Sequence, residues 1–254
     1  MSDWFLQQGH GVRFEWGPAG ARELAAGGGC LVVVDVLSFT TAVSVAVEAG
    51  TRVFPYGWRD ETAVAFARSK SAALAVGRSA ASPASPWSLS PAALRRAPYA
   101  PRLVLPSPNG SAISAAAGDA TVVAACLRNA KAVGQWLAGH GYGTAERPVL
   151  VVAAGERWPD GGLRPALEDL LGAGAVIAAL ASQGVGSLSP EAAAARGCFT
   201  QTADVAGAVA GCSSGIELAR GGFADDVAVA AELDASAVVP VLADGAFAQG
   251  ADVP

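Results

Sequence analysis

The sequence predicts an α/β fold with three layers, α/β/α, around a mainly parallel or mixed sheet. Short apolar segments typical of buried strands alternate with segments typical of helices, and this order favours right-handed crossovers within one sheet. Hydrophobic residues make up 52% of the 254 residues and charged residues only 15%, so a sizeable core is available. We expect a single domain over residues 1–254, with a surface excursion at 77–101 and a mostly helical closing segment at 188–254.

The first strand and helix contain the most informative residue. Residues 31–36 form a continuous apolar run after three glycines, which indicates a strand buried on both faces. Thr40 or Thr41 could cap the following helix, and Gly50 would end it. Asp35 is the single acid in this run, and we expect it at or near the end of the strand.

The same alternation continues along the chain. Further strands are expected at 51–55, 72–76, 102–105, 121–124, 149–153 and 238–242. Helices are expected at 61–70, from 112, and at 129–138, 166–181, 202–210, 214–220 and 224–233.

Composition argues against several kinds of partner. The net charge is −5 and no run of lysine or arginine occurs, so we expect no nucleic acid. No apolar run reaches the length of a transmembrane helix, and the first residues do not resemble a signal peptide, so we expect no membrane association. The four cysteines form no CxxC pair, which predicts neither a zinc ribbon nor a disulfide framework and favours a reducing cytoplasm.

Several catalytic classes fail on spacing. No P-loop motif occurs, and the nearest match to a dinucleotide fingerprint, "GAGAVI" from Gly172, lies inside a predicted helix. His10 and His140 belong to no metal-ligand spacing. No cysteine has the arginine six residues later that a cysteine phosphatase needs. Asp35 suits a haloacid-dehalogenase-like nucleophile, but Leu37 occupies the position of the second acid.

What remains is a set of polar residues at predicted strand ends. Asp35 is followed in the chain by "PSPNGS" (106–111), "CLRNAK" (126–131), "AAGERW" (153–158) and "LEDL" (167–170). Carboxyl ends of parallel strands meet at one edge of a sheet, where ligands bind. Asp35, Glu168 and Asp169 are oxygen ligands suited to Mg²⁺, and the amides of 109–111 suit an anion.

Each piece also has a structural interpretation. Asp35 could be a helix cap or a buried, hydrogen-bonded acid, and residues 107–111 could form an ordinary Asn-Gly turn. Asn129 could cap its helix, and Glu168 and Asp169 could be acids favoured by the helix dipole.

Taken in order, these motifs resemble the ComB family, the 2-phosphosulfolactate phosphatases. The resemblance rests on "VVVDVLSFTTAV" (32–43), "SPNGS", "CLRNAKAV", "VAAGE" with "LEDLLGAG", and the segment from Cys212 to Leu242. It implies a Mg²⁺-dependent phosphatase of coenzyme M biosynthesis, which hydrolyses 2-phosphosulfolactate or a related small acidic phosphomonoester. It also implies a cytoplasmic enzyme, a small-molecule substrate and a possible homodimer.

The resemblance implies a role for each motif residue. Asp35 would be catalytic, and Asp35, Glu168 and Asp169 would hold Mg²⁺. The substrate would be bound by Ser107, Asn109, Gly110, Ser111, Asn129 and Gly155. The sequence leaves open whether water or Asp35 attacks phosphorus, and in-line attack by water is our preferred hypothesis because an aspartyl-phosphate acid pair is absent.

The chain also departs from the family pattern. The family arginine after "VDVL" is Ser38, and "GRSAASPASPWSLSP" (77–91) replaces a Gly-Glu-Arg and Asn-Ser-Pro region, of which Ser90-Pro91 remains. Either another cation such as Arg128 or Arg157 serves in place of that arginine, or the chain is a catalytically altered or inactive ComB-like protein that binds a small anion.

Overall fold

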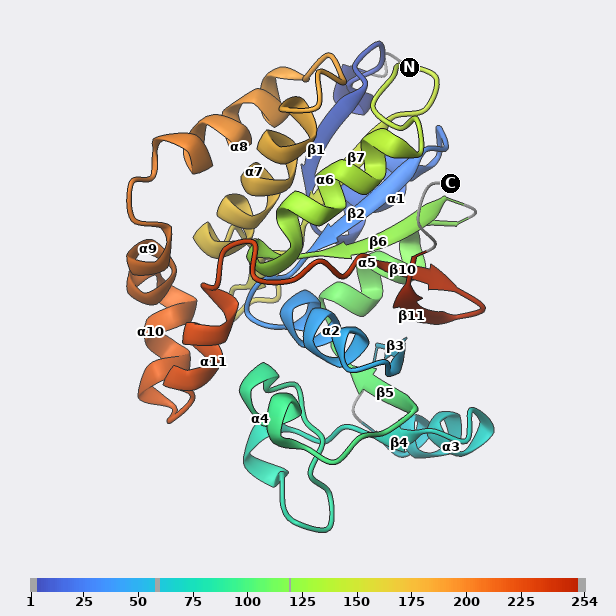
Figure 1. Cartoon of the computed structure of the whole chain (residues 1–254), viewed down its shortest axis with the longest axis vertical. Coiled ribbons are helices and arrows are strands. Elements are labelled where there is room, and N and C mark those ends of the chain that lie inside the picture. The colour runs from blue at the N-terminus through green and yellow to red at the C-terminus, as the bar shows by residue number, and fades with distance from the viewer. Residues whose placement is uncertain (1–3, 58–59, 119, 251–254) are drawn as a thin grey trace.

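The computed structural model describes residues 4–57, 60–118 and 120–250. In this part of the chain nine strands form one mixed, mostly parallel sheet, in the order β1-β7-β2-β6-β10-β11-β3-β5-β4 (Figure 1). The strands are β1 (Val12–Trp16), β2 (Cys30–Val34), β3 (Arg52–Tyr56), β4 (Ala73–Leu74), β5 (Arg102–Pro106), β6 (Thr121–Ala125), β7 (Val149–Ala153), β10 (Pro240–Ala243) and β11 (Ala246–Gln249). A separate ribbon pairs β8 (Glu156–Arg157) with β9 (Leu163–Arg164).

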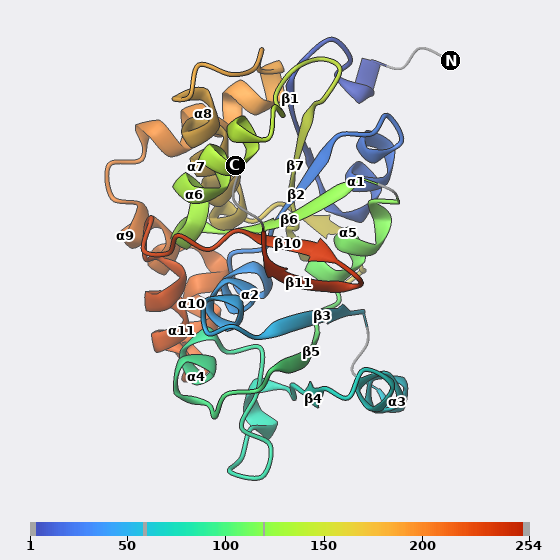
Figure 2. The same ribbon diagram turned by 45° about the vertical axis from the view of Figure 1, so that its right-hand side comes forward.

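Helices cover both faces of the sheet, which confirms the predicted α/β class. Helices α6, α7 and α8 lie on one side, and α1 and α5 lie on the other (Figures 1 and 2). The α-helices are α1 (Gly17–Ala25), α2 (Phe39–Glu48), α3 (Glu61–Ser69), α4 (Pro91–Arg96), α5 (Gly110–Ala116), α6 (Ala130–Gly139), α7 (Leu167–Ala181), α8 (Pro190–Gln201), α9 (Val205–Gly211), α10 (Ser213–Arg220) and α11 (Ala224–Ala230). Short 3₁₀ helices are η1 (Trp4–Leu6), η2 (Arg78–Ala80) and η3 (Leu127–Asn129).

Strand β2 is apolar throughout because both of its faces are covered. Leu31 and Val33 pack into a core formed with α1, α2 and α5. Val32 and Val34 point the other way, into a core formed with α6 and α7. A strand of this kind has no solvent-facing side, so its sequence shows no alternation of polar and apolar residues.

The sheet contains two parallel groups of strands. Strands β1, β7, β2 and β6 are parallel to one another, and so are β3, β5 and β4. The antiparallel hairpin β10–β11 lies between the groups and pairs antiparallel with β6 on one side and with β3 on the other. Because these three successive pairings are all antiparallel, the strands of the second group run in the opposite direction to those of the first. The sheet is therefore mixed.

Several predicted elements differ from the structure. Strand β1, helices α1 and α8, and strand β11 were not predicted from the sequence. Neither Thr40 nor Thr41 caps α2, which begins at Phe39; their hydroxyls donate to the carbonyls of Asp35 and Val36 at 2.8 and 2.7 Å. The predicted strand 238–242 is the first arm of the β10–β11 hairpin.

The segment 77–101 and the closing segment touch each other. Residues 88–92 of the former are buried, and α4 packs against α2 and α11. Within the described residues, no helix combines the length and the apolar character that a bilayer span requires.

Candidate active site

Asp35 lies immediately beyond the carboxyl end of β2, with its side chain only 6% exposed. Its Oδ1 accepts a hydrogen bond from the amide of Phe39, at the start of α2, at 3.1 Å. Its Oδ2 accepts one from the amide of Gly110, at the start of α5, also at 3.1 Å. The turn "SPNGS" therefore meets Asp35, as the prediction required, although the intervening strands are not all parallel.

The contact from Gly110 depends on the absence of a side chain. A Cβ atom at Gly110 would lie 2.2 Å from Cδ1 of Phe39, far inside van der Waals contact. Gly110 is thus the residue that allows the backbone of this turn to approach Asp35.

Asp169 is held in the same manner in the first turn of α7. Its Oδ1 accepts from the amide of Val36 at 2.7 Å, and its Oδ2 accepts from the amide of Gly155 at 2.8 Å. Helix α7 can approach the end of β2 this closely because a Cβ at Gly172 would lie only 2.7 Å from Val36. Asp169 therefore ties together the segments that follow β2 and β7.

Glu168 precedes Asp169 and is also buried. The thiol of Cys212, which caps α10, donates to Oε2 of Glu168 at 3.2 Å. Burial, followed by the charge of Glu168, raises the pKa of Cys212 to about 11, so this thiol stays protonated at neutral pH.

Glu156 belongs to the same group, although the motif analysis assigned it no role. It begins β8, and its Oε2 accepts from Nδ2 of Asn109 at 3.4 Å. The same Nδ2 donates to the carbonyl of Gly155 at 3.3 Å. Asp35, Glu156, Glu168 and Asp169 are called the acid cluster below.

The acid cluster is electrostatically unfavourable when all its members are ionised. Burial raises the pKa of Asp35 to about 6, and two amide hydrogen bonds oppose that shift. Burial, then the charges of Asp35 and Glu168, raise the pKa of Glu156 to about 7. The pKa of Asp169 is raised well above its ordinary value by burial and then by Asp35 and Glu168. A cation bound here would relieve this repulsion.

The donor set of the acid cluster fits Mg²⁺. Within residues 4–57, 60–118 and 120–250, no group of three or more Asp, Glu, His or Cys side chains is arranged so that it could hold a metal ion. Mg²⁺ does not need one, because it retains several waters and takes only one or two carboxylates from a protein. Each oxygen of Asp35 accepts one amide hydrogen bond and keeps a lone pair for a metal.

The predicted substrate-binding residues divide into two groups. Ser107, Asn109, Gly110, Ser111 and Gly155 lie in the segments that meet at Asp35. The hydroxyl of Ser111 is buried without a hydrogen-bond partner among the described residues, so it is available to a ligand. Ser111 also lines a cavity of about 890 Å³, together with Tyr56, Phe66, Pro108, Ala112 and Arg157.

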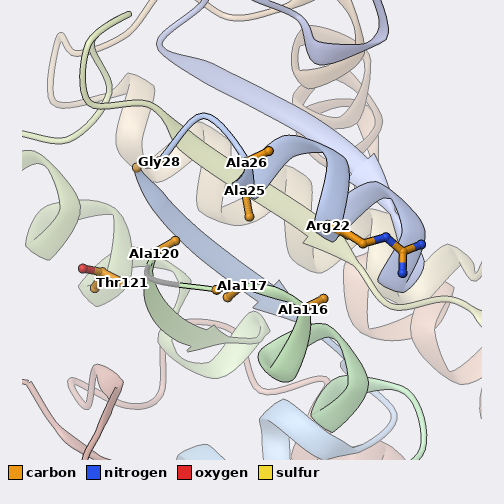
Figure 3. A pocket seen from close by; sticks show the side chains of 10 residues that line it. Arg22, Ala25, Ala26, Gly28, Ala116, Ala117, Ala120 and Thr121 are labelled. Atoms are coloured by element: carbon orange, nitrogen blue, oxygen red, sulfur yellow. The ribbon is translucent and has the colours of Figure 1, made fainter.

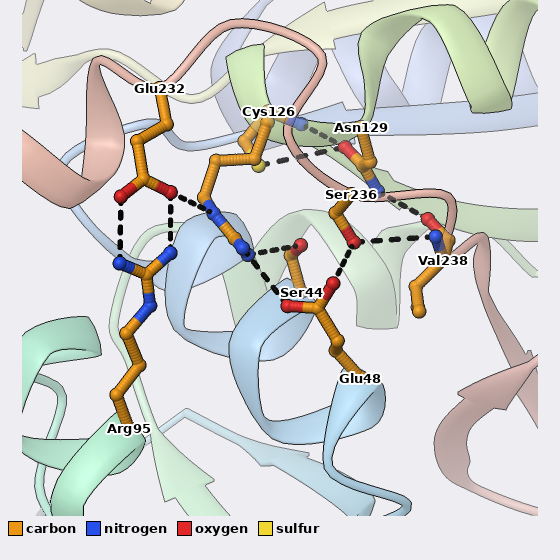
Figure 4. Close-up of polar contacts among 9 residues, drawn as sticks. Ser44, Glu48, Arg95, Cys126, Asn129, Glu232, Ser236 and Val238 are labelled. Atoms are coloured by element: carbon orange, nitrogen blue, oxygen red, sulfur yellow. Dashed lines mark hydrogen bonds and ion pairs between the residues drawn. The ribbon is translucent and has the colours of Figure 1, made fainter.

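Asn129 lies apart from these residues. Its Oδ1 accepts from the amide of Cys126 at 2.9 Å, and its Nδ2 donates to the carbonyl of Val238 at 3.0 Å (Figure 4). The same Nδ2 donates to the carbonyl of Ala124 at 3.3 Å. Its amide hydrogens are thus used within the protein, and we do not include Asn129 among the substrate contacts proposed below.

A further cavity lies at the opposite ends of β2 and β6. It measures about 480 Å³ and is lined mainly by alanine and glycine, with Arg22 and Thr121 at its margins (Figure 3). No member of the acid cluster lines this cavity or the cavity of about 890 Å³, but the latter contains Ser111 of the predicted substrate-binding residues and the former contains none of them.

The comparison with protein families agrees with this geometry. A family model described as 2-phosphosulpholactate phosphatase matches residues 19–245, a span that includes the whole acid cluster. A search of curated proteins found no match. Phosphatases of this family are metal-dependent. The chain belongs to the 2-phosphosulpholactate phosphatase (ComB) family, a family of phosphoric monoester hydrolases.

Proposed function

We propose that this chain is a Mg²⁺-dependent phosphatase that hydrolyses a small acidic phosphomonoester to a hydroxy acid and phosphate. The substrate would be 2-phosphosulfolactate or a related phosphorylated hydroxy acid. The observation that carries the proposal is the buried Asp35 carboxylate, which accepts the amide of Gly110 in the Asn109–Ser111 turn and interacts electrostatically with Glu156, Glu168 and Asp169. This arrangement brings ligands for a cation beside donors for an anion.

Asp35 with Glu168 or Asp169 would hold the metal. Bound there, Mg²⁺ supplies charge neutralisation for the phosphoryl oxygens and promotes the ionisation of water. The amides of Phe39 and Gly110 fix the orientation of the Asp35 carboxylate. Both Asp35 oxygens are held in this way, which favours a role as a fixed ligand over a role as the nucleophile.

The chain's other residues would orient the ester and manage its protons. The unpartnered hydroxyl of Ser111 would donate to a phosphoryl oxygen. The side-chain amide of Asn109 already donates to the carbonyl of Gly155 and to Glu156, so its role would be to position Glu156. Water would attack phosphorus in line with the ester oxygen and release one proton to solvent, the P–O ester bond would break, and the leaving oxygen would take a proton. Glu156, whose pKa is raised by burial to about 7, would donate that proton at neutral pH.

The biological setting is part of the same proposal. A role in coenzyme M biosynthesis would supply a substrate with a sulfonate and a carboxylate. All four cysteines are free thiols, which suits a reducing cytoplasm. We also propose that the chain can form a homodimer, which sedimentation of the purified protein would test.

The proposed function is tested by a screen for phosphate release. Phosphorylated hydroxy acids, including 2-phosphosulfolactate, are incubated with the protein in Mg²⁺ and in EDTA. We expect release from at least one ester, and only with the metal. Release that persists in EDTA would contradict Mg²⁺ dependence. No release from any ester would leave the alternative, an inactive member that binds a small anion.

A further inference from the structure

Arg78 approaches the active-site loop from the 77–101 segment. It begins η2, and its Nη2 donates to the hydroxyl of Ser38, three residues after Asp35. Its Nε donates to Oδ2 of Asp226 at 2.9 Å, and the guanidinium carbon lies 5.7 Å from the ring centroid of Phe223. The side chain is only 17% exposed, so the cation is held in a defined position.

The position of Arg78 places its charge at the candidate active site. Burial is the largest influence on the pKa of Asp35 and raises it, while the positive charge of Arg78 acts in the opposite direction. Ser38 directly precedes Phe39, whose amide binds Asp35. Arg78 therefore stands beside the acid cluster, next to the position where the sequence lacks the family arginine.

The two arginines expected from the sequence have other partners. Arg128 donates to Ser44, Glu48 and Glu232, which form the network in Figure 4. Arg157 is exposed, and its Nη1 donates to the carbonyl of Gly161 at 3.1 Å. Among the described residues, neither donates a hydrogen bond to the loop that carries Ser38, whereas Arg78 does.

Asp226 holds Arg78 in place from the closing segment. It lies on α11 and is 1% exposed. Its Oδ1 accepts from the hydroxyl of Ser90 and, at 3.2 Å, from the amide of Ala92 at the start of α4. A single buried carboxylate thus fixes both ends of the 77–92 segment. A buried ion pair of this kind restricts the guanidinium to one orientation.

We propose that Arg78 is the anion-binding cation of this site and determines its preference for acidic phosphomonoesters. The proposal rests on the proposed phosphatase function. Within the described residues, Arg78 uses Nε for Asp226 and Nη2 for Ser38, so Nη1 is available to an oxygen of phosphate, carboxylate or sulfonate. Guanidinium groups bind such oxygens strongly and with defined geometry.

The first test removes the charge and measures binding of inorganic phosphate by calorimetry, which needs no turnover. Arg78→Ala should weaken phosphate binding about tenfold to a hundredfold, the range of a lost charge-assisted hydrogen bond. Arg96→Ala is the matched control, because Arg96 pairs with Asp225, the neighbour of Asp226, in an exposed ion pair at 3.6 Å. It should change phosphate affinity less than twofold.

The second test moves the charge. In the Arg78→Ala background, Ser38→Arg returns a guanidinium to the same place, so phosphate affinity and KM for an acidic ester should recover at least in part. Ser38→Arg alone adds a second cation beside Arg78 and should give no such gain. A purely structural Arg78 would not be replaced in this way by a guanidinium at position 38, because the link to Asp226 would remain broken. If Arg78→Ala fails to fold, the same phosphate-binding measurement is made on Arg78→Lys and on the double variant.

The outcomes separate this inference from the proposed function. Phosphate binding that is the same in Arg78→Ala and the parent overturns the inference, whether or not the parent is a phosphatase. An absence of phosphate binding to the parent overturns it as well. If the parent binds phosphate through Arg78 but hydrolyses no ester, the inference stands and the proposed function fails.

Discussion

Asp35 and Asp169 each receive two backbone amide hydrogen bonds, and the four donors come from three segments of the chain. Amide donors fix the direction of a carboxylate, but they carry only partial charge. Burial therefore outweighs them, and the pKa values of both acids remain raised. The fold therefore fixes the positions of the carboxylates, but their negative charge is not neutralised until a cation binds.

The buried acids, without a cation to neutralise them, predict how the stability of the metal-free protein depends on pH. The pKa of Asp35 rises from 3.8 to about 6 on folding, so the folded state holds this proton more tightly than the unfolded state. The metal-free protein should therefore lose stability as pH rises from about 4 to about 6, by about 2–3 kcal/mol for this group. Denaturant unfolding in EDTA at pH 5 and pH 7.5 spans about half of this range, so the two free energies of unfolding should differ by about 1–1.5 kcal/mol for this group.

Two variants assign that loss to the site. Asp35→Asn should reduce the difference between the two pH values, whereas Glu191→Gln, which alters an exposed acid at the start of α8, should not. An unchanged pH dependence in Asp35→Asn would show that Asp35 keeps an ordinary pKa in the folded protein.

Glu156 is expected to act on the leaving group. Glu156→Gln removes the proton donor, so hydrolysis of alkyl phosphates should slow by about 100-fold or more. Esters of p-nitrophenol need no protonation of the leaving oxygen and should be affected much less. The ratio of kcat for the two ester types measures the effect, and equal losses for both would exclude this role.

The sequence could predict Asp35 because an acid inside a buried apolar run is itself unusual. Glu156 and Arg78 could not be found in this way. Each is a single charged residue in a polar segment, and only tertiary contacts bring it to Asp35. For Asn129, a motif position does not reveal that the side chain donates to the carbonyls of Ala124 and Val238, so its predicted substrate contact stays a prediction.

At the scale of elements, the approach of α5 to β2 determines whether the site forms. In Gly110→Ala, the new methyl would collide with Phe39, so α5 must move and its amide must leave Asp35. We expect a loss of about 1–3 kcal/mol of stability from overpacking, and a loss of Mg²⁺-dependent activity. Thermal unfolding and phosphate release measure both.

Gly197→Ala provides the matched control for that substitution. Gly197 lies within α8, and no atom lies within 4 Å of the position its Cβ would take. This substitution should stabilise the protein by about 0.5–1 kcal/mol and leave activity unchanged. Full activity in Gly110→Ala would mean that the amide contact to Asp35 is dispensable.

Elements with strong local signals were predicted well, and those defined by pairing were not. The strands from β2 to β7 and the helices α2, α3, α6 and α7 follow from apolar runs and periodicity. The β10–β11 hairpin follows from Asp244-Gly245, a turn signal that the sequence analysis did not use. Its position between two parallel groups could not be predicted, because local sequence does not specify which strands a hairpin joins.

At the scale of the whole molecule, the last third of the chain joins segments that precede it. Asp226 holds the 77–92 segment, Glu232 pairs with Arg95 on α4, and β11 pairs with β3. These contacts support our prediction of a single domain. A protease nick in the exposed residues 79–84 should leave the fragments associated, with one unfolding transition. Two separable halves or two transitions would contradict it.

The central claim, that the acid cluster is a metal-dependent phosphatase site, is tested most directly by one comparison. Phosphate release from the best ester is measured for the parent and Asp35→Asn, both at saturating Mg²⁺, with thermal unfolding as the check on folding. We predict that Asp35→Asn loses Mg²⁺-dependent release while its metal-free form is at least as stable as the parent, because a buried charge has been removed. Release at the parental rate would show that Asp35 is structural and that the catalytic centre lies elsewhere.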